Sequence, residues 1–251
     1  MTLPVVVIAG SDSSGGAGLA RDVATIAALG GSVRPVVTAV TAQTDGRVTA
    51  VERMPAALVA AQLEAALETG LVAGPAGAVK IGMLGAAQTV EAVAAVLSAW
   101  RRLPVVLDPV LASSSGVELL DEEGREVMKR ELFPLAGILT PNLPEAALLT
   151  GLPPASTAAE IAAQARALLA CGPRAVLMKG GHAEGEEAVD RLFDADGGLR
   201  CFVAPRARTN LRGTGCTLAS ALAAGLAAGQ TVAAACEAAK AFIQQRLAPV
   251  R

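Results

Sequence analysis

Short apolar runs alternate with amphipathic stretches over most of the chain. The runs predict strands at Val5–Ala9, Val33–Val40, Ala78–Met83, Val105–Asp108, Gly137–Thr140 and Ala175–Lys179. The stretches between them predict helices over Leu19–Leu29, Pro55–Gly70, Thr89–Trp100, Glu122–Leu132 and Thr157–Ala170, and two more helices end the chain. Alternating strands and helices are typical of a mainly parallel sheet that is covered on both faces. We therefore expect a three-layer α/β/α fold.

Two segments depart from this alternation and predict antiparallel hairpins. A polar turn precedes the short run Val48–Val51, so we expect a small hairpin near residues 32–53. Two later runs, Ala188–Phe193 and Leu199–Val203, flank a turn with two glycines and predict a hairpin at one edge of the sheet. The sequence has no internal repeat and no linker-like segment, so residues 1–251 are interpreted as a single domain.

Composition and charge limit the kinds of partner. Of the 251 residues, 53% are apolar and only 2% are aromatic, so aliphatic side chains must fill the core. The formal net charge is −2, and both signs are mixed along the chain. Because the sequence has no basic stripe, it indicates neither a nucleic-acid partner nor an anionic membrane surface. A small metabolite fits better.

The cysteines indicate a reducing environment. Cys171, Cys201, Cys216 and Cys236 have no CxxC or CxxH spacing, which argues against a zinc site and against a disulfide scaffold. The N-terminal apolar run has no basic flank and ends at Gly10, too early for a secretion signal. We expect a cytoplasmic protein.

A glycine-rich loop, GSDSSGGAG, joins the first predicted strand to the first predicted helix. Its two outer glycines have the spacing of a P-loop, but Gly16-Ala17 stands where that motif needs Lys and Ser or Thr. The dinucleotide fingerprint also fails, because Arg21 stands where its last glycine would be. The loop either lets a small ligand approach the main chain, with Asp12 and Asp22 as polar groups, or is only a tight turn.

Three charged residues follow predicted strands, where ligands bind in such sheets. Asp108 and Glu145 could bind Mg²⁺, which takes one or two protein carboxylates and keeps several waters; each could equally be a helix cap or a turn residue. Lys179, followed by two glycines, could hold a nucleotide phosphate or be a solvated lysine. His182 is the only histidine and is interpreted as a loop residue.

The stretch TNLRGTGCTL, at Thr209–Leu218, places two glycines before Cys216 at the start of an apolar helix. The first N–H groups of a helix form an anion site, and Gly213 and Gly215 leave that site open. The positive field there is expected to lower the pKa of Cys216 and favour its thiolate. A thiolate facing a bound phosphoryl group could accept a proton from an attacking hydroxyl. The alternative is an inert thiol in a tight turn.

Seven segments carry a resemblance that runs nearly the length of the chain. In order, they are IAGSDSSGGAG, TAVTAQ, KIGML, VLDPV, TPNLPEA, VLMKGGH and GTGCTLASALAA. In these segments the sequence resembles the ribokinase-like superfamily, and specifically the hydroxymethylpyrimidine/phosphomethylpyrimidine kinases of thiamine biosynthesis. The resemblance implies ATP- and Mg²⁺-dependent phosphorylation of 4-amino-5-hydroxymethyl-2-methylpyrimidine to its monophosphate, and of the monophosphate to the diphosphate. An alanine-rich chain with an edge hairpin is also compatible with a homodimer, which we expect.

The resemblance implies roles for individual residues on the phosphate side. An anion hole would be formed by Gly213, Thr214, Gly215 and Cys216. Cys216 would occupy the place where sugar kinases of the superfamily keep an aspartate base. Lys179 and Thr214 would contact the ATP phosphates, while Asp108 and Glu145 would organise Mg²⁺.

On the substrate side, Gln43 would read the pyrimidine. A carboxamide can accept a hydrogen bond from the 4-amino group and donate one to the adjacent ring nitrogen, as Asn and Gln do with adenine. The resemblance implies that Gly10, Asp22, Met83 and Val110 line the rest of the pocket.

The sequence departs from the family pattern at three places. Leu211-Arg212 replaces the usual Thr-His before GTGC, Ser113-Ser114-Ser115 stands where many members have a lysine, and Thr44 replaces a common Asn. Arg212 adds a cation near the phosphates. These departures bear on the second phosphorylation more than on the first.

Two alternatives remain open. A pyridoxal or pyridoxine kinase would also take a flat heteroaromatic ring with a hydroxymethyl group, although Gln43 favours the aminopyrimidine. The second alternative is a non-catalytic module that binds the pyrimidine. The presence of Asp108, Glu145, Lys179 and Cys216 argues against it.

Overall fold

Nine strands form a single sheet in the part of the chain that the structure describes, in the order β3-β2-β1-β4-β5-β6-β7-β8-β9. This computed structural model describes residues 4–44, 46–72, 77–113, 115–182, 185–206 and 212–247. The strands are β1 (Val5–Asp12), β2 (Val33–Gln43), β3 (Val48–Arg53), β4 (Ala78–Ile81), β5 (Val105–Leu107), β6 (Ile138–Leu139), β7 (Ala175–Met178), β8 (Glu187–Asp194) and β9 (Leu199–Pro205). Strands β2, β1, β4, β5, β6 and β7 are parallel to one another, while β3 and β8 are antiparallel to their neighbours.

Helices connect most of these strands. They are α1 (Gly18–Ala28), α2 (Ala56–Val72), α3 (Ala87–Leu97), α4 (Glu122–Val127), α5 (Leu143–Thr150), α6 (Ala158–Leu169), α7 (Thr214–Ala227) and α8 (Val232–Leu247). A π-helical segment, Met128–Leu132, and a 3₁₀ turn, Phe133–Leu135, continue α4, and a second 3₁₀ turn spans Gly180–His182.

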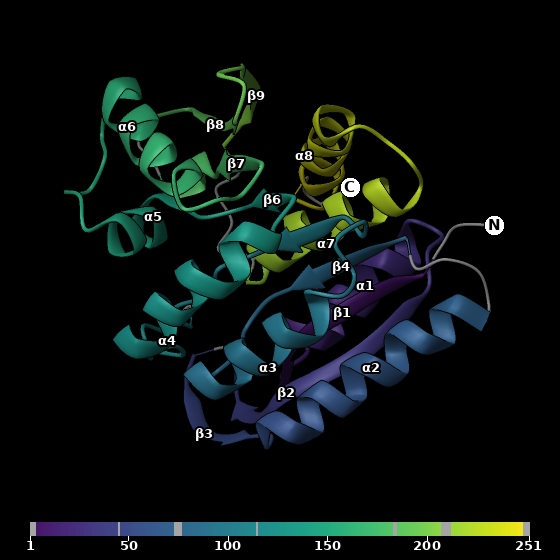
Figure 1. The fold of residues 1–251 in the computed structure, drawn as a ribbon. Coiled ribbons are helices and arrows are strands. Elements are labelled where there is room, and N and C mark those ends of the chain that lie inside the picture. Colours follow the sequence, from purple (N-terminus) through teal and green to yellow (C-terminus); the bar gives the residue numbers. More distant parts are fainter. Residues whose placement is uncertain are drawn as a thin grey trace.

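Successive residues of the central strands face opposite helical layers, because side chains alternate along a strand. Val6 and Ile8 of β1 pack in one core with residues of α2 and α3. Val5 and Val7 pack in a second core with residues of α1, α7 and α8. The two sets of helices lie on opposite sides of the sheet (Figure 1). The predicted three-layer, mainly parallel fold is confirmed.

The direction in which successive strands are added to the sheet reverses between β1 and β4. β1 lies between β2 and β4 and is parallel to both. The chain leaves β1 through α1 to β2 on one side, and it leaves β4 through α3 to β5 on the other. Such a reversal opens a crevice beyond the carboxyl ends of the two strands, where ligands of open α/β sheets bind.

Both predicted hairpins are present, at the two edges of the sheet. β8 and β9 form the hairpin predicted at one edge. At the other edge only β3 is an addition, since β2 pairs in parallel with β1 and belongs to the main sheet. β1 and β2 also extend past their predicted ends, to Asp12 and Gln43. They therefore carry these two polar residues to the crevice.

Helix α5 was not among the helices predicted from the sequence, and its start lies in the segment TPNLPEA. Asn142 is the N-cap and forms a capping box with Glu145, and each residue accepts a hydrogen bond from the other's main-chain N–H. Pro144 lies in the first turn, where a missing N–H breaks no helical hydrogen bond. Among the described residues, no helix is long and apolar enough to cross a membrane.

The packing of α2 on the sheet gives a stability prediction. Leu63→Ala, at a side chain with 0% exposure in the first core, is expected to lower the free energy of unfolding by about 2–5 kcal/mol, because it leaves a cavity. Leu58→Ala, on the same helix but 48% exposed, should change it by only about 0.5 kcal/mol. Urea unfolding of both variants measures the difference. Equal effects would contradict the placement of this helix.

Candidate active site

The GTGC segment forms the first turn of α7. Gly213 caps the helix with φ 73°, a left-handed conformation that glycine adopts without strain, and α7 begins at Thr214. A Cβ atom on Gly213 would collide with the carbonyl oxygen of Gly16 in the glycine-rich loop. Gly213 has no side chain to cap this turn, and the first N–H groups of a helix form an anion site. The predicted helix start is confirmed.

The three charged residues predicted at strand ends meet beside this turn. Lys179 Nζ lies 2.7 Å from Asp108 Oδ1 and 3.8 Å from Glu145 Oε2. A Cβ atom on Gly215 would lie 3.3 Å from Lys179 Nζ and 3.7 Å from Asp108 Oδ2, so the helix start and the charged cluster are in contact. Burial alone would lower the pKa of Lys179, but Asp108 and Glu145 raise it overall. The ammonium is therefore charged at neutral pH.

Glu145 has a structural role in addition to its place in this cluster. Its Oε2 accepts a 2.8 Å hydrogen bond from the main-chain N–H of Asn142, which makes it the capping-box residue of α5. The alternative interpretation of Glu145 as a helix-cap residue is thus correct. Burial and the Asp108 charge raise the pKa of Glu145 to about 7, although Lys179 opposes this shift. A cation near this carboxylate would favour its ionised form.

A buried ion pair holds the turn that follows Lys179. Asp190 of β8 accepts a 2.8 Å hydrogen bond from the main-chain N–H of Gly180. Its other carboxylate oxygen lies 2.8 Å from Nζ of Lys240 on α8. Arg206 donates to the carbonyl oxygen of Gly180 from a third direction, at 3.3 Å. The main chain beside Lys179 is therefore tied to β8 and α8.

Cys216 lies at the third position of α7, and its thiol is less acidic than the sequence suggested. Burial raises the pKa of Cys216 to about 11. The charge of Lys80 lowers this pKa, as does a hydrogen bond from the main chain of Gly18, while Asp22 and Asp108 raise it. Desolvation outweighs the helix field, so the prediction of a lowered pKa was wrong.

Asp22, which the sequence analysis placed in the substrate pocket, forms a buried ion pair. Its side chain is fully buried on α1, where Oδ2 lies 2.8 Å from Nζ of Lys80 and Oδ1 accepts a 2.7 Å hydrogen bond from Ser220 of α7. Both carboxylate oxygens are therefore engaged, and Asp22 holds Lys80; its place in the substrate pocket stays a prediction. Sequence analysis missed Lys80, although a lysine inside an otherwise apolar strand was a visible signal.

Three other predicted pocket residues come together. Met83 belongs to a small apolar cluster with Ala39 and Leu119, and Val110 packs against it. A Cβ atom on Gly10 would lie 2.9 Å from the sulfur of Met83, so only glycine leaves room for this contact. The cluster lies past the carboxyl ends of β4 and β5, next to the crevice.

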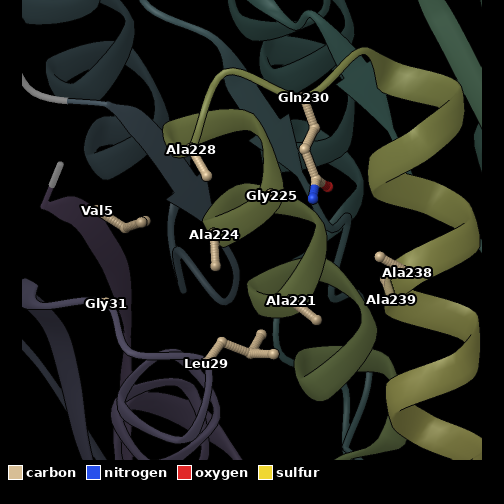
Figure 2. Close-up of a pocket in the computed structure, with 10 residues that line it drawn as sticks. All are labelled: Val5, Leu29, Gly31, Ala221, Ala224, Gly225, Ala228, Gln230, Ala238 and Ala239. Carbon is tan, nitrogen blue, oxygen red and sulfur yellow. The ribbon is translucent and has the colours of Figure 1, made fainter. Parts of the chain in front are cut away.

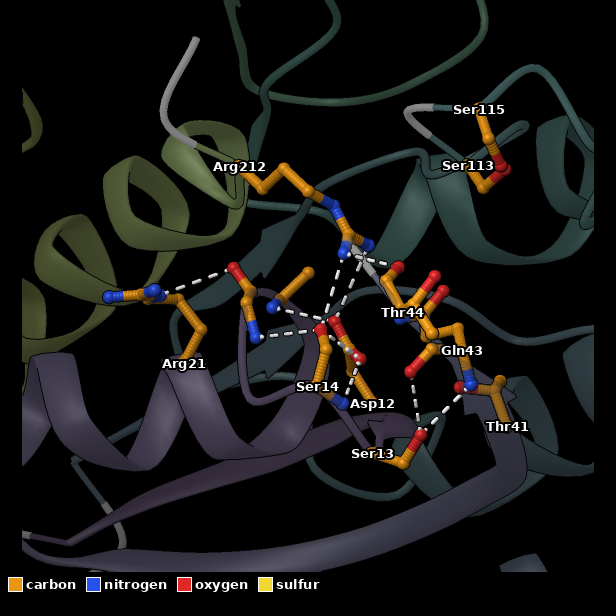
Figure 3. A network of polar contacts seen from close by, with 12 residues as sticks. Asp12, Ser13, Ser14, Arg21, Thr41, Gln43, Thr44, Ser113, Ser115 and Arg212 are labelled. Carbon is orange, nitrogen blue, oxygen red and sulfur yellow. Dashed lines mark hydrogen bonds and ion pairs between the residues drawn. The ribbon is translucent and has the colours of Figure 1, made fainter. Parts of the chain in front are cut away.

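Gln43, at the end of β2, belongs to a polar network with the glycine-rich loop (Figure 3). Its main-chain N–H and carbonyl oxygen both bond to the hydroxyl of Ser13, at 2.9 Å each. Burial alone would raise the pKa of Asp12, but hydrogen bonds from Ser14 and Gln43 and the charge of Arg212 lower it overall. These neighbours therefore favour the ionised form of Asp12.

A cavity of about 120 Å³ lies elsewhere and is a different feature (Figure 2). Its lining includes Val5 at the start of β1 and Ala228 just past the end of α7. These are the opposite ends of the two elements from the glycine-rich loop and Gly213. The lining contains no charged side chain, and Gln230 is its one polar side chain.

Of the residues at which the sequence departs from the family pattern, Leu211 and Ser114 lie outside the described residues. Arg212 donates a 2.9 Å hydrogen bond to the carbonyl oxygen of Thr44, the residue after Gln43. Ser113 and Ser115 are 2.9 Å apart through their hydroxyl oxygens.

Comparison with known proteins decides the family. The family described as phosphomethylpyrimidine kinase matches residues 12–250. The chain belongs to this family. A hydroxymethylpyrimidine/phosphomethylpyrimidine kinase from Rhizobium meliloti is 45% identical over 243 residues, covering 97% of this chain and 90% of the relative. The predicted enzyme class, a phosphotransferase of thiamine biosynthesis, is confirmed by this membership.

Solved structures agree with the family and place pyridoxal kinases further away. The crystal structure of phosphomethylpyrimidine kinase from Clostridium difficile superposes on this chain with a TM-score of 0.84 at 36% identity. The match covers 98% of this chain and 100% of that one. Pyridoxal kinase from Staphylococcus aureus, in complex with AMP-PCP and pyridoxal, has the same TM-score of 0.84 at 30% identity, covering 97% of this chain and 87% of that one. Pyridoxal kinases are therefore structural relatives of this chain, at lower sequence identity than the phosphomethylpyrimidine kinase.

The buried pair behind the site gives a second stability prediction. Asp22→Asn leaves the ammonium of Lys80 without its carboxylate at 0% exposure, which should cost about 3–5 kcal/mol in the free energy of unfolding. The double variant Asp22→Asn with Lys80→Met removes both charges and should recover most of that loss. Urea unfolding of the single and double variants measures it. A single variant as stable as the parent would show that the pair is not buried as described.

Proposed function

We propose that the chain transfers the γ-phosphoryl group of ATP to the hydroxymethyl group of 4-amino-5-hydroxymethyl-2-methylpyrimidine, and then phosphorylates the monophosphate to the diphosphate. One observation supports this most directly. The open first turn of α7, the Lys179–Asp108 pair and the apolar cluster around Met83 all lie at the carboxyl edge of the sheet. That edge thus offers an anion site beside an apolar surface, which is what a kinase of a flat heterocycle needs.

The phosphate side of the proposal rests on α7 and Lys179. The N–H groups of Gly213, Thr214, Gly215 and Cys216 would bind the transferred phosphoryl group, as helix N-termini bind anions. Lys179 and Thr214 would contact the ATP phosphates. ATP is supported as donor because a related pyridoxal kinase binds AMP-PCP. In-line transfer of this kind depends mainly on positioning and on neutralising charge.

Asp108 and Glu145 would hold Mg²⁺. Among the residues that the structure describes, no cluster of three or more His, Cys, Asp or Glu forms a metal cage. Mg²⁺ bound with nucleotide does not require one, because one or two carboxylates are completed by phosphates and waters. Two carboxylates within 3.8 Å of one ammonium fit that pattern. Bound Mg²⁺ would neutralise charge on the phosphates.

Cys216 would face the acceptor hydroxyl. In the proposed step, the hydroxyl oxygen forms a bond to the γ-phosphorus, the bond from that phosphorus to the β–γ bridging oxygen breaks, and ADP leaves. The hydroxyl proton passes to Cys216 Sγ in its thiolate form. With a pKa of about 11 the thiolate is a minor but strongly basic species, and the Lys80 charge favours it. We therefore assign more of the catalysis to the anion hole than to this base.

The substrate side rests on Gln43 and the apolar cluster. The carboxamide of Gln43 would pair with the 4-amino group and the adjacent ring nitrogen, while Gly10, Met83 and Val110 would contact the ring. A single-domain homodimer in the cytoplasm, without a nucleic-acid partner, completes the proposal.

A coupled assay of ADP release tests the function. With the pyrimidine alcohol, its monophosphate and pyridoxal as acceptors, we expect the highest kcat/KM for the two pyrimidines. A higher value for pyridoxal would instead assign the chain to the pyridoxal kinases. Ligand-dependent thermal protection without ADP release would indicate a binding module.

The role of Cys216 gives a prediction within that assay. Cys216→Ser should lower kcat about 10²–10⁴-fold, the range of a lost general base, because a serine hydroxyl is much harder to deprotonate. The KM for ATP should stay within about twofold, since the main-chain N–H groups remain. Steady-state kinetics on the pyrimidine alcohol measures both. An unchanged kcat would remove Cys216 from the base role.

A further inference from the structure

Arg212 connects three segments that are distant in sequence. From the residue before Gly213, its guanidinium reaches the hydroxyl of Ser14 at 3.2 Å, the carbonyl oxygen of Thr44 at 2.9 Å and the carboxylate of Asp12 at 3.6 Å. Its side chain is 17% exposed. Figure 3 shows it extended from the start of α7 over the glycine-rich loop toward the end of β2. Arg212 therefore links the phosphate side of the site to the substrate side.

Asp12 is the residue that organises the glycine-rich loop. One carboxylate oxygen accepts hydrogen bonds from the N–H and the hydroxyl of Ser14, at 2.8 and 2.7 Å. The other accepts a 2.8 Å hydrogen bond from the N–H of Ala17. Asp12 is only 6% exposed, so a cation nearby offsets part of the cost of burying its charge. Arg212 supplies that cation.

Gln43 depends on the same loop for its conformation. Ser13, next to Asp12, holds the main chain of Gln43 through two hydrogen bonds. The Gln43 side chain lies near enough to Asp12 to lower the pKa of that carboxyl. Thr44, which Arg212 also holds, is the next residue along the chain. The position of Gln43 is thus determined by contacts to Asp12, Ser13 and Thr44, and two of these three residues contact Arg212.

We propose that Arg212 is a positioning residue for the pyrimidine, acting through Asp12 and Thr44 to orient the carboxamide of Gln43. This inference rests on the proposed function, in which Gln43 reads the aminopyrimidine. In this role Arg212 would act through these residues and not through direct contact with the substrate. Its loss would leave Asp12 without this cation and Thr44 without this donor, so only the Ser13 hydrogen bonds and the β1–β2 pairing would still hold the end of β2 against the glycine-rich loop.

The shape of arginine suits this role. A guanidinium presents five N–H donors in a rigid planar fork, so one side chain can serve a carboxylate, a hydroxyl and a carbonyl oxygen in different directions. A lysine carries the charge on a flexible stem and would keep the attraction to Asp12, but not all three contacts. The proposal therefore predicts partial function for lysine at this position.

The test compares Arg212→Met, Arg212→Lys and a matched control. Arg34→Met removes another arginine that donates to a main-chain oxygen, that of Ala66, near the start of β2 and away from the site. For Arg212→Met we expect the KM for the pyrimidine alcohol to rise about tenfold, while the KM for ATP stays within about twofold. Arg212→Lys should lie between this variant and the parent, and Arg34→Met should match the parent.

Calorimetric binding of the pyrimidine alcohol without ATP gives a second readout that needs no turnover. We expect the Kd to rise in Arg212→Met by the same factor as the KM. If Arg212→Met fails to fold in a thermal melt, Asp12→Asn, which keeps the size of the side chain and removes its charge, is expected to show the same selective loss of pyrimidine affinity.

The outcomes separate this inference from the proposed function. An equal rise in both KM values, or a larger rise for ATP, would overturn the positioning role and place Arg212 on the phosphate side. Unchanged affinity for the pyrimidine in Arg212→Met would also overturn it. A parent protein that binds the pyrimidine but releases no ADP would contradict the proposed kinase activity, while the binding comparison would still decide the role of Arg212.

Discussion

The ion pair between Lys80 and Asp22 joins the three elements from which the candidate site is built. Lys80 comes from β4, Asp22 from α1, and Ser220 of α7 donates to the same carboxylate. Removing two charges from water costs several kcal/mol for each ion, and only close geometry and further hydrogen bonds compensate for it. Because both side chains have 0% exposure, the pair can exist only when β4, α1 and α7 are in register. The starts of α1 and α7 are thereby held together beside the carboxyl end of the sheet.

The same principle extends to the other charges near the site. Lys179 is paired with Asp108, Arg212 with Asp12 and Lys240 with Asp190. Each pair joins segments far apart in the sequence, so the pairs position main-chain groups as well as balance charge. The first turn of α7 is where N–H groups are left open. A bound polyphosphate would therefore meet main-chain N–H groups and Lys179, whose charge is already shared by two carboxylates. The proposal assigns Mg²⁺ to this place because the phosphates need further positive charge.

Strand and helix order followed from hydrophobic periodicity, because a buried parallel sheet needs short apolar strands separated by amphipathic helices. The predicted positions of Lys179, Asp108 and Gly213 also followed, because carboxyl ends of parallel strands meet at one edge. Helix α5 was not predicted, although Asn142, Pro144 and Glu145 form a local start signal: a capping box with proline in the first turn. The pKa of Cys216 was predicted in the wrong direction, because a helix N-terminus is visible in the sequence while the desolvation around the thiol is not.

The sequence by itself determined the family, the fold class and the residue types that could perform phosphoryl transfer, because these are properties of local pattern and motif order. Only the tertiary structure decided what each polar residue does. It turned Asp22 inward to Lys80, placed Glu145 beside Lys179, and laid Arg212 across the glycine-rich loop. The reason is physical: burial and the identity of a charged partner are set by residues distant in the sequence, 58 positions apart for Lys80 and Asp22, and no local pattern encodes them.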